Sequence, residues 1–133
     1  MKWHERVNKD PKVYLAGPIN GRTNSECTSW RDRAQELLSI SSVDPMQRDY
    51  RGIEDANAQE LVADDKHKII SCRWLLAFCW SISVGTSMEI LFAHERGLRV
   101  VVVSIEPVSP WLMVHSELVV ETLDEACAYI NTH

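Results

Sequence analysis

The chain has few of the residue patterns that bind metals or form disulfides. Its four cysteines form no Cys-x-x-Cys pair, and no cysteine and histidine have the spacing of a metal-ligand set. Three of the four fall on segments that are predicted to be core helix or strand, so we expect reduced, buried thiols. The pattern therefore predicts no metal site and a cytoplasmic location; the cysteines are Cys27, Cys72, Cys79 and Cys127.

Long apolar runs and basic runs are also missing. No run approaches the length of a membrane span, and residues 1–5 are too polar to begin a signal peptide. The formal net charge is −5, which argues against a general nucleic-acid surface, although one or two arginines could still hold a small phosphate. No Gly-x-Gly-x-x-Gly follows the first predicted strand, which disfavours a dinucleotide-dependent oxidoreductase.

What is present is an alternation of strand and helix patterns over residues 12–133, after a polar lead-in at residues 1–11. Apolar or β-branched runs predict strands at 12–17, 42–44, 74–78, 99–104 and 118–120. Helical spacing predicts helices at 25–39, 56–71, from the turn after residue 81 to Gly97, and at 123–131, with a short one within 109–116. This order predicts a single α/β domain, an open parallel sheet of about five strands flanked by helices, Rossmann-like or flavodoxin-like.

In such a sheet the ligand site lies at the carboxyl edge of the strands. The loops 17–22, 44–52, 81–89 and 104–116 should therefore open on the same edge. The first and third of them should face each other across the switch point. The charged segment 45–53 is long enough to cover a site.

The most informative stretch is 81–93, in which small and hydroxylated residues separate a buried strand from an amphipathic helix. Backbone N–H groups and hydroxyls in such a turn suit an anion such as phosphate. Glu89 would lie one turn into the helix, where the dipole favours its ionised form, and a carboxylate is the nucleophile that attack on an acetal carbon requires. The same residues also fit a capping box, with Thr86 as N-cap and Glu89 reaching back to it.

Five segments in order resemble the nucleoside 2-deoxyribosyltransferase family, which includes hydrolases of 2'-deoxynucleoside 5'-phosphates. They are Tyr14-Leu15-Ala16-Gly17-Pro18-Ile19, Ser29-Trp30-Arg31, Asp44-Pro45, Asp65 with Ile69, and Ser83-Val84-Gly85-Thr86-Ser87-Met88-Glu89. The resemblance runs from about residue 12 to residue 130, nearly the whole chain.

The resemblance implies roles for individual residues. Glu89 would attack C1' of the sugar, Asp65 would assist the leaving base or orient the sugar, and Tyr14 would line the site. A serine at position 83 favours a 5'-phosphate, because an aspartate there would repel it. The other implied substrate or phosphate contacts are Gly17, Ile19, Asn20, Gly21, Arg22, Gly85, Ser87, Ser109 and Trp111.

Three of these predicted contacts have more than one possible role or candidate residue. Arg22 is either a phosphate ligand or an ordinary loop arginine. Trp111 would stack on the base, plug the core or form a dimer contact. Ser109, with Ser116 as second candidate, would come from a neighbouring subunit, so the resemblance implies at least a homodimer.

The predicted function is hydrolysis of the N-glycosidic bond of a (deoxy)nucleoside 5'-monophosphate, without a cofactor. The alternatives are a deoxyribosyltransferase that exchanges bases and a non-catalytic nucleotide-binding protein. The chain departs from the family pattern in two places: Arg73 stands where an acid is usual, and a polar residue would be expected near Phe78. The first departure concerns sheet architecture more than chemistry, but it weakens any inference about base preference.

Overall fold

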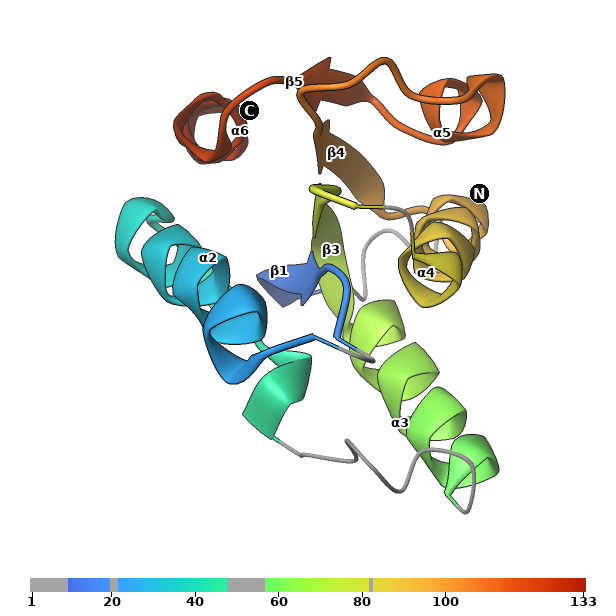
Figure 1. The fold of residues 1–133 in the computed structure, drawn as a ribbon. Coiled ribbons are helices and arrows are strands. Elements are labelled where there is room, and N and C mark those ends of the chain that lie inside the picture. Colours follow the sequence, from blue (N-terminus) through green and yellow to red (C-terminus); the bar gives the residue numbers. More distant parts are fainter. Residues whose placement is uncertain (1–9, 20–21, 48–56, 82) are drawn as a thin grey trace.

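Five parallel strands form one sheet in the order β2-β1-β3-β4-β5 (Figure 1). The computed structural model describes residues 10–19, 22–47, 57–81 and 83–133. The strands are β1 (Asp10–Ala16), β2 (Ser41–Val43), β3 (Cys72–Phe78), β4 (Arg99–Val103) and β5 (Leu118–Val120). The predicted fold class is confirmed, and the predicted strands differ from the observed ones only by a few residues at their ends.

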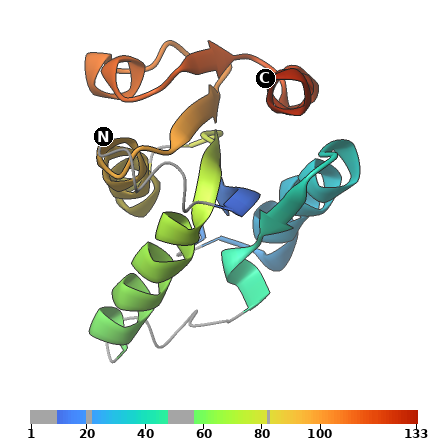
Figure 2. The same ribbon diagram turned by 180° about the vertical axis from the view of Figure 1, so that it is seen from behind.

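Helices cover both faces of this sheet (Figures 1 and 2). On one side α2 (Asn24–Leu37) packs beside α6 (Leu123–Thr132). On the other side α3 (Ala58–Ser71) packs beside α4 (Val84–Glu95), and the short α5 (Pro110–Val114) lies against α4. A single 3₁₀ turn, η1 (Pro45–Gln47), follows β2. None of the helices in the described ranges has the length and apolar character that a bilayer crossing needs.

The apolar run of β1 explains the two-sided cover. Val13 and Leu15 point into the core under α2 and α6, whereas Tyr14 and Ala16 point into the core under α3 and α4. All four side chains are buried. A strand buried on both faces needs an unbroken apolar sequence, and the run of valines in β4 follows the same rule.

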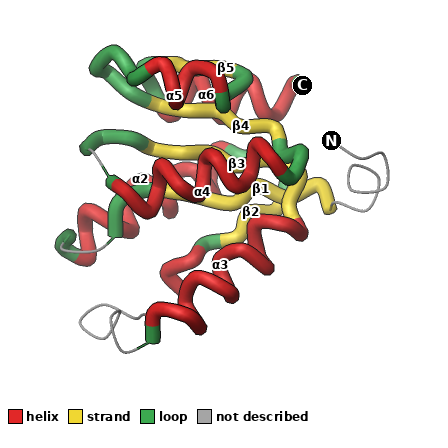
Figure 3. The backbone as a smooth tube through the Cα atoms, turned by 90° about the vertical axis from the view of Figure 1, so that its right-hand side faces the viewer, coloured by secondary structure: helices red, strands yellow, loops and turns green. Residues whose placement is uncertain are grey.

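Parallel pairing places the strands' carboxyl ends at one edge. Figure 3 shows the strands together in yellow, with the loops that follow β3 and β4 leaving from the same end. Arg73 is the second residue of β3 and is exposed, so it lies near the opposite edge. Phe78 stacks on Trp30 at 5.1 Å between ring centroids, which places this departure from the family pattern in the core between sheet and helix.

Candidate active site

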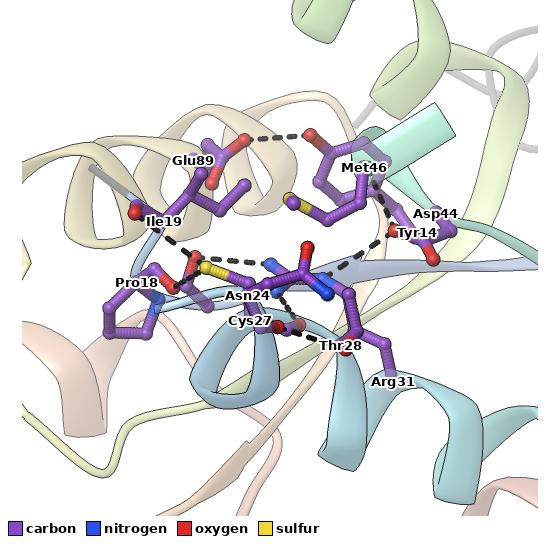
Figure 4. Close-up of polar contacts among 11 residues, drawn as sticks. Tyr14, Pro18, Ile19, Asn24, Cys27, Thr28, Arg31, Asp44, Met46 and Glu89 are labelled. Atoms are coloured by element: carbon purple, nitrogen blue, oxygen red, sulfur yellow. Dashed lines mark hydrogen bonds and ion pairs between the residues drawn. The ribbon is translucent and has the colours of Figure 1, made fainter. Parts of the chain in front are cut away.

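The contact at the centre of the carboxyl edge joins Tyr14 and Glu89. Tyr14 is a fully buried residue of β1, and Glu89 is a partly buried residue of α4. The phenol Oη donates a hydrogen bond of 2.8 Å to Glu89 Oε2, and Figure 4 shows the two side chains pointing toward each other. A hydrogen bond from the phenol to one carboxylate oxygen fixes the orientation of the Glu89 carboxylate.

Tyr14 is held in its neutral, donating form. Burial raises the pKa of its phenol well above the usual value, and the negative charges of Glu89 and Asp65 raise it further. Asp65 is a partly buried residue of α3, close enough to act electrostatically on Tyr14. The structure therefore brings together Tyr14, Asp65 and Glu89, which the sequence placed on three separate elements.

Helix α4 begins earlier in the sequence than the capping-box interpretation predicted. Ser83 is the N-cap: its backbone is extended, and its Oγ accepts the Thr86 N–H at 3.2 Å. Thr86 is the third residue of the helix and is buried, so the prediction that it caps the helix is wrong. Ser83 takes the position because an extended residue can turn its hydroxyl back onto the first helical turn. Glu89 therefore lies in the second turn, too far along to close a capping box.

Several polar groups at this helix end are not used by the helix itself. Ser87 N–H donates to Ser83 O, which starts the helical bonding and leaves the N–H groups of Val84 and Gly85 ahead of it. A methyl group built on Gly85 would meet only Ser83 Oγ, at 4.0 Å, so the approach to this backbone is open. The buried Thr86 Oγ1 has no hydrogen-bond partner. Helix N-termini with free N–H groups are suited to anions.

The first and third loops meet at the switch point, as predicted. Arg22 Nη2 donates to Ser81 Oγ at 2.9 Å, and its guanidinium lies 4.9 Å from the ring centroid of Trp80. The Arg22 N–H donates to Ile19 O at 3.0 Å, which closes a turn after β1. Arg22 therefore joins the two loops, and its role as a phosphate ligand remains a prediction. Asn20, Gly21 and residues 48–53 of the predicted covering segment 45–53 lie outside the described residues.

Gly17 is required by packing. A Cβ built there would lie 2.7 Å from Cζ2 of the buried Trp30, so the indole occupies the space of a side chain. The Gly17 carbonyl accepts a hydrogen bond from Arg31 Nη2 at 3.1 Å. Both contacts fix the backbone that leads from β1 into the first loop.

The two predicted contacts on the fourth loop lie at the start of the short helix α5, which packs against α4. Ser109 caps α5, where its Oγ accepts the Leu112 N–H at 3.4 Å. Trp111 is 72% exposed and stacks on His115, which rules out the core alternative. Ser116 Oγ donates to Leu112 O at 2.6 Å.

No role was predicted from the sequence for Arg31 and Asp44, although both lie in segments that resemble the family. Arg31 is fully buried, and its Nε lies 3.7 Å from Asp44 Oδ1 (Figure 4). The signal was available: with Cys27, Trp30 and Ala34, Arg31 completes the i, i+3, i+4, i+7 pattern of the core-facing side of α2. An arginine on such a side is uncommon unless it is paired.

Over the described ranges, no group of three or more histidine, cysteine or acidic side chains is arranged to hold a metal ion. All four cysteines are free, and Cys27, Cys72 and Cys127 are buried. Burial raises the pKa of the partly buried Cys79 to about 11, which keeps its thiol protonated and unreactive at neutral pH.

Comparison with known proteins gives matches at the level of structure. No protein-family model matches the chain, and no curated protein sequence matches it. A 2-deoxyribosyltransferase from Bacillus psychrosaccharolyticus superposes with a TM-score of 0.73 at 14% identity, over 90% of this chain and 95% of the other. A conserved protein from Enterococcus faecalis V583 superposes with a TM-score of 0.71 at 14% identity, over 92% and 98% of the two chains. A putative pilus assembly-related protein from Burkholderia pseudomallei K96243 is less similar, with a TM-score of 0.55 at 10% identity over 99% and 94%. The chain therefore has an α/β fold like that of a 2-deoxyribosyltransferase.

Proposed function

We propose that the protein hydrolyses the N-glycosidic bond of a (deoxy)nucleoside 5'-monophosphate. The observation that carries the proposal is the 2.8 Å hydrogen bond from Tyr14 to Glu89, with Asp65 nearby, at the carboxyl edge of a parallel sheet. Two carboxylates around one centre are what glycoside cleavage uses.

In the proposed reaction the Glu89 carboxylate attacks C1' of the sugar. The C1'–N bond breaks, its electron pair leaves with the base, and Asp65 supports the departing base by a proton or a hydrogen bond. Water then attacks C1' of the glycosyl ester: its hydroxyl group joins the sugar and its proton passes to the base, directly or through Asp65, which restores the Glu89 carboxylate and releases the sugar 5-phosphate. Tyr14 keeps donating to Oε2, so it orients the nucleophile in both steps.

The N-terminus of α4 supports a phosphate rather than a bare hydroxyl at the 5' position. Free N–H groups at Val84 and Gly85, with the Ser83 hydroxyl, would form a neutral, donor-rich anion site. The Ser83 oxygen accepts from Thr86, so its own O–H remains to donate. Ser87 Oγ donates to Ser83 O, which reinforces the cap.

The second candidate is base exchange by a deoxyribosyltransferase, because the 2-deoxyribosyltransferase from Bacillus psychrosaccharolyticus superposes with a TM-score of 0.73. The two reactions share the first step and differ in whether water or a second base resolves the glycosyl ester. The third candidate, a non-catalytic nucleotide-binding protein, does not account for an oriented carboxylate beside the anion site.

The test is incubation with the four deoxynucleoside and four ribonucleoside monophosphates and the matching nucleosides, with and without an added base. Free base is measured by chromatography. Release from monophosphates that Glu89→Gln abolishes and Glu95→Gln, an exposed site on the same helix, leaves intact would support the proposal. Turnover of nucleosides only with an acceptor base would make the protein a transferase. Tight binding without turnover would leave a nucleotide-binding protein.

The proposal includes a second copy of this chain that covers α5 and the start of α4. Five exposed apolar side chains lie on these two helices, which pack against each other: Val84 and Met88 on α4, and Trp111, Met113 and Val114 on α5. Ser109 is the N-cap of α5, at one end of this helix. Burial of such a group is the usual reason for a homodimer.

A further inference from the structure

Arg31 is a buried cation that connects three segments around the first loop. Its Nη1 donates to Cys27 O at 2.5 Å and its Nη2 to Gly17 O at 3.1 Å, while its guanidinium lies over the Trp30 ring, 4.6 Å from the centroid. None of its side-chain surface is exposed. An arginine presents its donors on separate nitrogens of a rigid plane, so Nη1 and Nη2 each bond a different carbonyl, whereas a lysine has a single donor nitrogen.

Asp44 extends this arrangement to the second loop. Its Oδ1 lies 3.7 Å from Arg31 Nε and also accepts the Met46 N–H at 2.8 Å, at the first turn after β2. One carboxylate oxygen thus faces the guanidinium and the backbone of the second loop. The pair therefore links the loop after β1 to the loop after β2 (Figure 4).

Stability alone does not explain this pair. Moving two charged groups out of water costs more free energy than an ion pair with a separation of 3.7 Å recovers. In the described part of the chain, Arg31 Nε also has no hydrogen bond. Burial lowers the pKa of Arg31, whereas Asp44, Glu89 and Tyr14 act in the opposite direction. The cation therefore lies within electrostatic reach of Tyr14 and Glu89.

We propose that Arg31 is a positioning residue: with Asp44 it holds the backbone at Gly17 and the turn at Met46 in fixed places relative to Glu89, and so sets where the substrate's sugar phosphate binds. The role in catalysis depends on the function proposed above. The role in holding the first loop does not, and the experiment reads the two separately.

The experiment compares Arg31→Met, Asp44→Leu, the double variant and Arg31→Lys. The matched control is Arg33→Met, which removes a half-exposed arginine two residues along the same helix. Thermal unfolding measures the fold, and hydrogen exchange of the Arg22 amide, bonded to Ile19 O, measures the first loop. A core amide of β3, that of Leu76, is the reference for global opening. The value of kcat/KM with monophosphates measures the site.

The double variant decides between a positioning and a merely structural role. The double variant replaces the ion pair by an apolar pair of similar size, so the protein is expected to unfold near the wild-type temperature. The Arg22 amide should nevertheless exchange about tenfold faster relative to Leu76, and kcat/KM should fall about 100-fold, the cost of a misplacement of about 1 Å. Wild-type exchange and turnover in a stable double variant would overturn the proposal.

The experiment also tests the proposal if the wild type shows no turnover or if the double variant does not fold. If the wild type turns over no nucleotide, the proposed function fails, and the Arg22 exchange in the double variant still tests whether Arg31 holds the loop. If the double variant does not fold, Arg31→Lys replaces it. Faster Arg22 exchange at unchanged Leu76 exchange then supports the proposal, and unchanged exchange overturns it.

Discussion

A buried phenol bonded to a partly buried carboxylate makes Tyr14 the residue with the largest expected effect on the reactivity of Glu89. The bond crosses from the sheet to a helix, so it depends on the packing of α4 against β1. The phenol stays neutral because burial and two carboxylates oppose its ionisation. It can therefore donate to Glu89 at neutral and moderately alkaline pH.

Tyr14→Phe should slow turnover without unfolding the protein. A hydrogen bond to a charged group contributes about 1.5–3 kcal/mol, which corresponds to a factor of about 10–100 in rate. The measurement is kcat on a monophosphate, with the melting temperature as control. Turnover equal to that of the wild type would show that Tyr14 does not orient the nucleophile.

The raised pKa of Tyr14 also gives a pH dependence of stability. Unfolded tyrosines ionise at about pH 10, whereas folded Tyr14 stays protonated above that pH. Its contribution is thus complete below pH 10 or so and is lost as the pH rises further. In urea unfolding, the wild type should lose stability above that pH more steeply than Tyr14→Phe. Parallel curves for the two proteins would contradict the assignment.

Two glycines at the site should respond to alanine in opposite ways. Gly17→Ala forces a methyl group against Trp30 and should cost about 1–3 kcal/mol of unfolding free energy, as overpacking does. Gly85→Ala meets open space in a helix and should add about 0.5–1 kcal/mol. Because the same methyl group covers the N–H groups of the anion site, Gly85→Ala should also weaken monophosphate binding. Calorimetry measures both the unfolding free energy and the binding of monophosphates. A Gly17→Ala protein as stable as the wild type would show that the Trp30 side chain moves aside at little cost in free energy.

At the scale of the element, the beginning of α4 combines a structural and a binding function in one residue. Ser83 caps the helix with its oxygen, and its hydroxyl proton is left for a ligand. Substitutions that keep one function and remove the other can therefore separate them.

Ser83→Ala removes the cap and should lower the unfolding free energy by about 1 kcal/mol. Ser83→Asp keeps a good cap, so stability should be retained, but it adds a negative charge where the phosphate is proposed to bind. Ser83→Asp should therefore bind monophosphates at least tenfold more weakly than the wild type, while binding of the matching nucleosides is unchanged. Calorimetric titration of both ligand classes is the measurement. Equal loss for both classes would place the phosphate elsewhere.

At the scale of the whole molecule, the exposed apolar side chains gather on α4 and α5 and predict self-association. Met113→Glu combined with Val114→Lys keeps the net charge and changes only exposed side chains of α5. Sedimentation velocity should find a dimer for the wild type and a monomer for this variant. A monomeric wild type at micromolar concentration would contradict the proposal. Substitution of the exposed Glu121 by Gln, beyond β5, is the control.

The sequence by itself determined the fold class and the edge at which the loops gather. Strands buried on both faces need continuous apolar runs, helices need apolar residues at helical spacing, and parallel strands place their loops together. These rules are local or topological, which is why β1, β3 and β4 were predicted within two residues at each end. The helix that ends near Gly97 follows the same logic, since Gly97 adopts a φ of 85°.

Only the tertiary structure decided which polar groups are in contact. Tyr14 and Glu89 are 75 residues apart in the sequence. Hydrophobic periodicity predicts which face of a strand or helix is buried, but it does not predict that a phenol on the sheet points at a carboxylate on a helix. The N-cap of α4 was mistaken for the same reason, because Ser83 and Thr86 are equally good caps in sequence and the backbone geometry selects between them. The burial of Arg31 depends on three segments that meet only in the folded chain, since the cost of an enclosed charge is set by its neighbours in space.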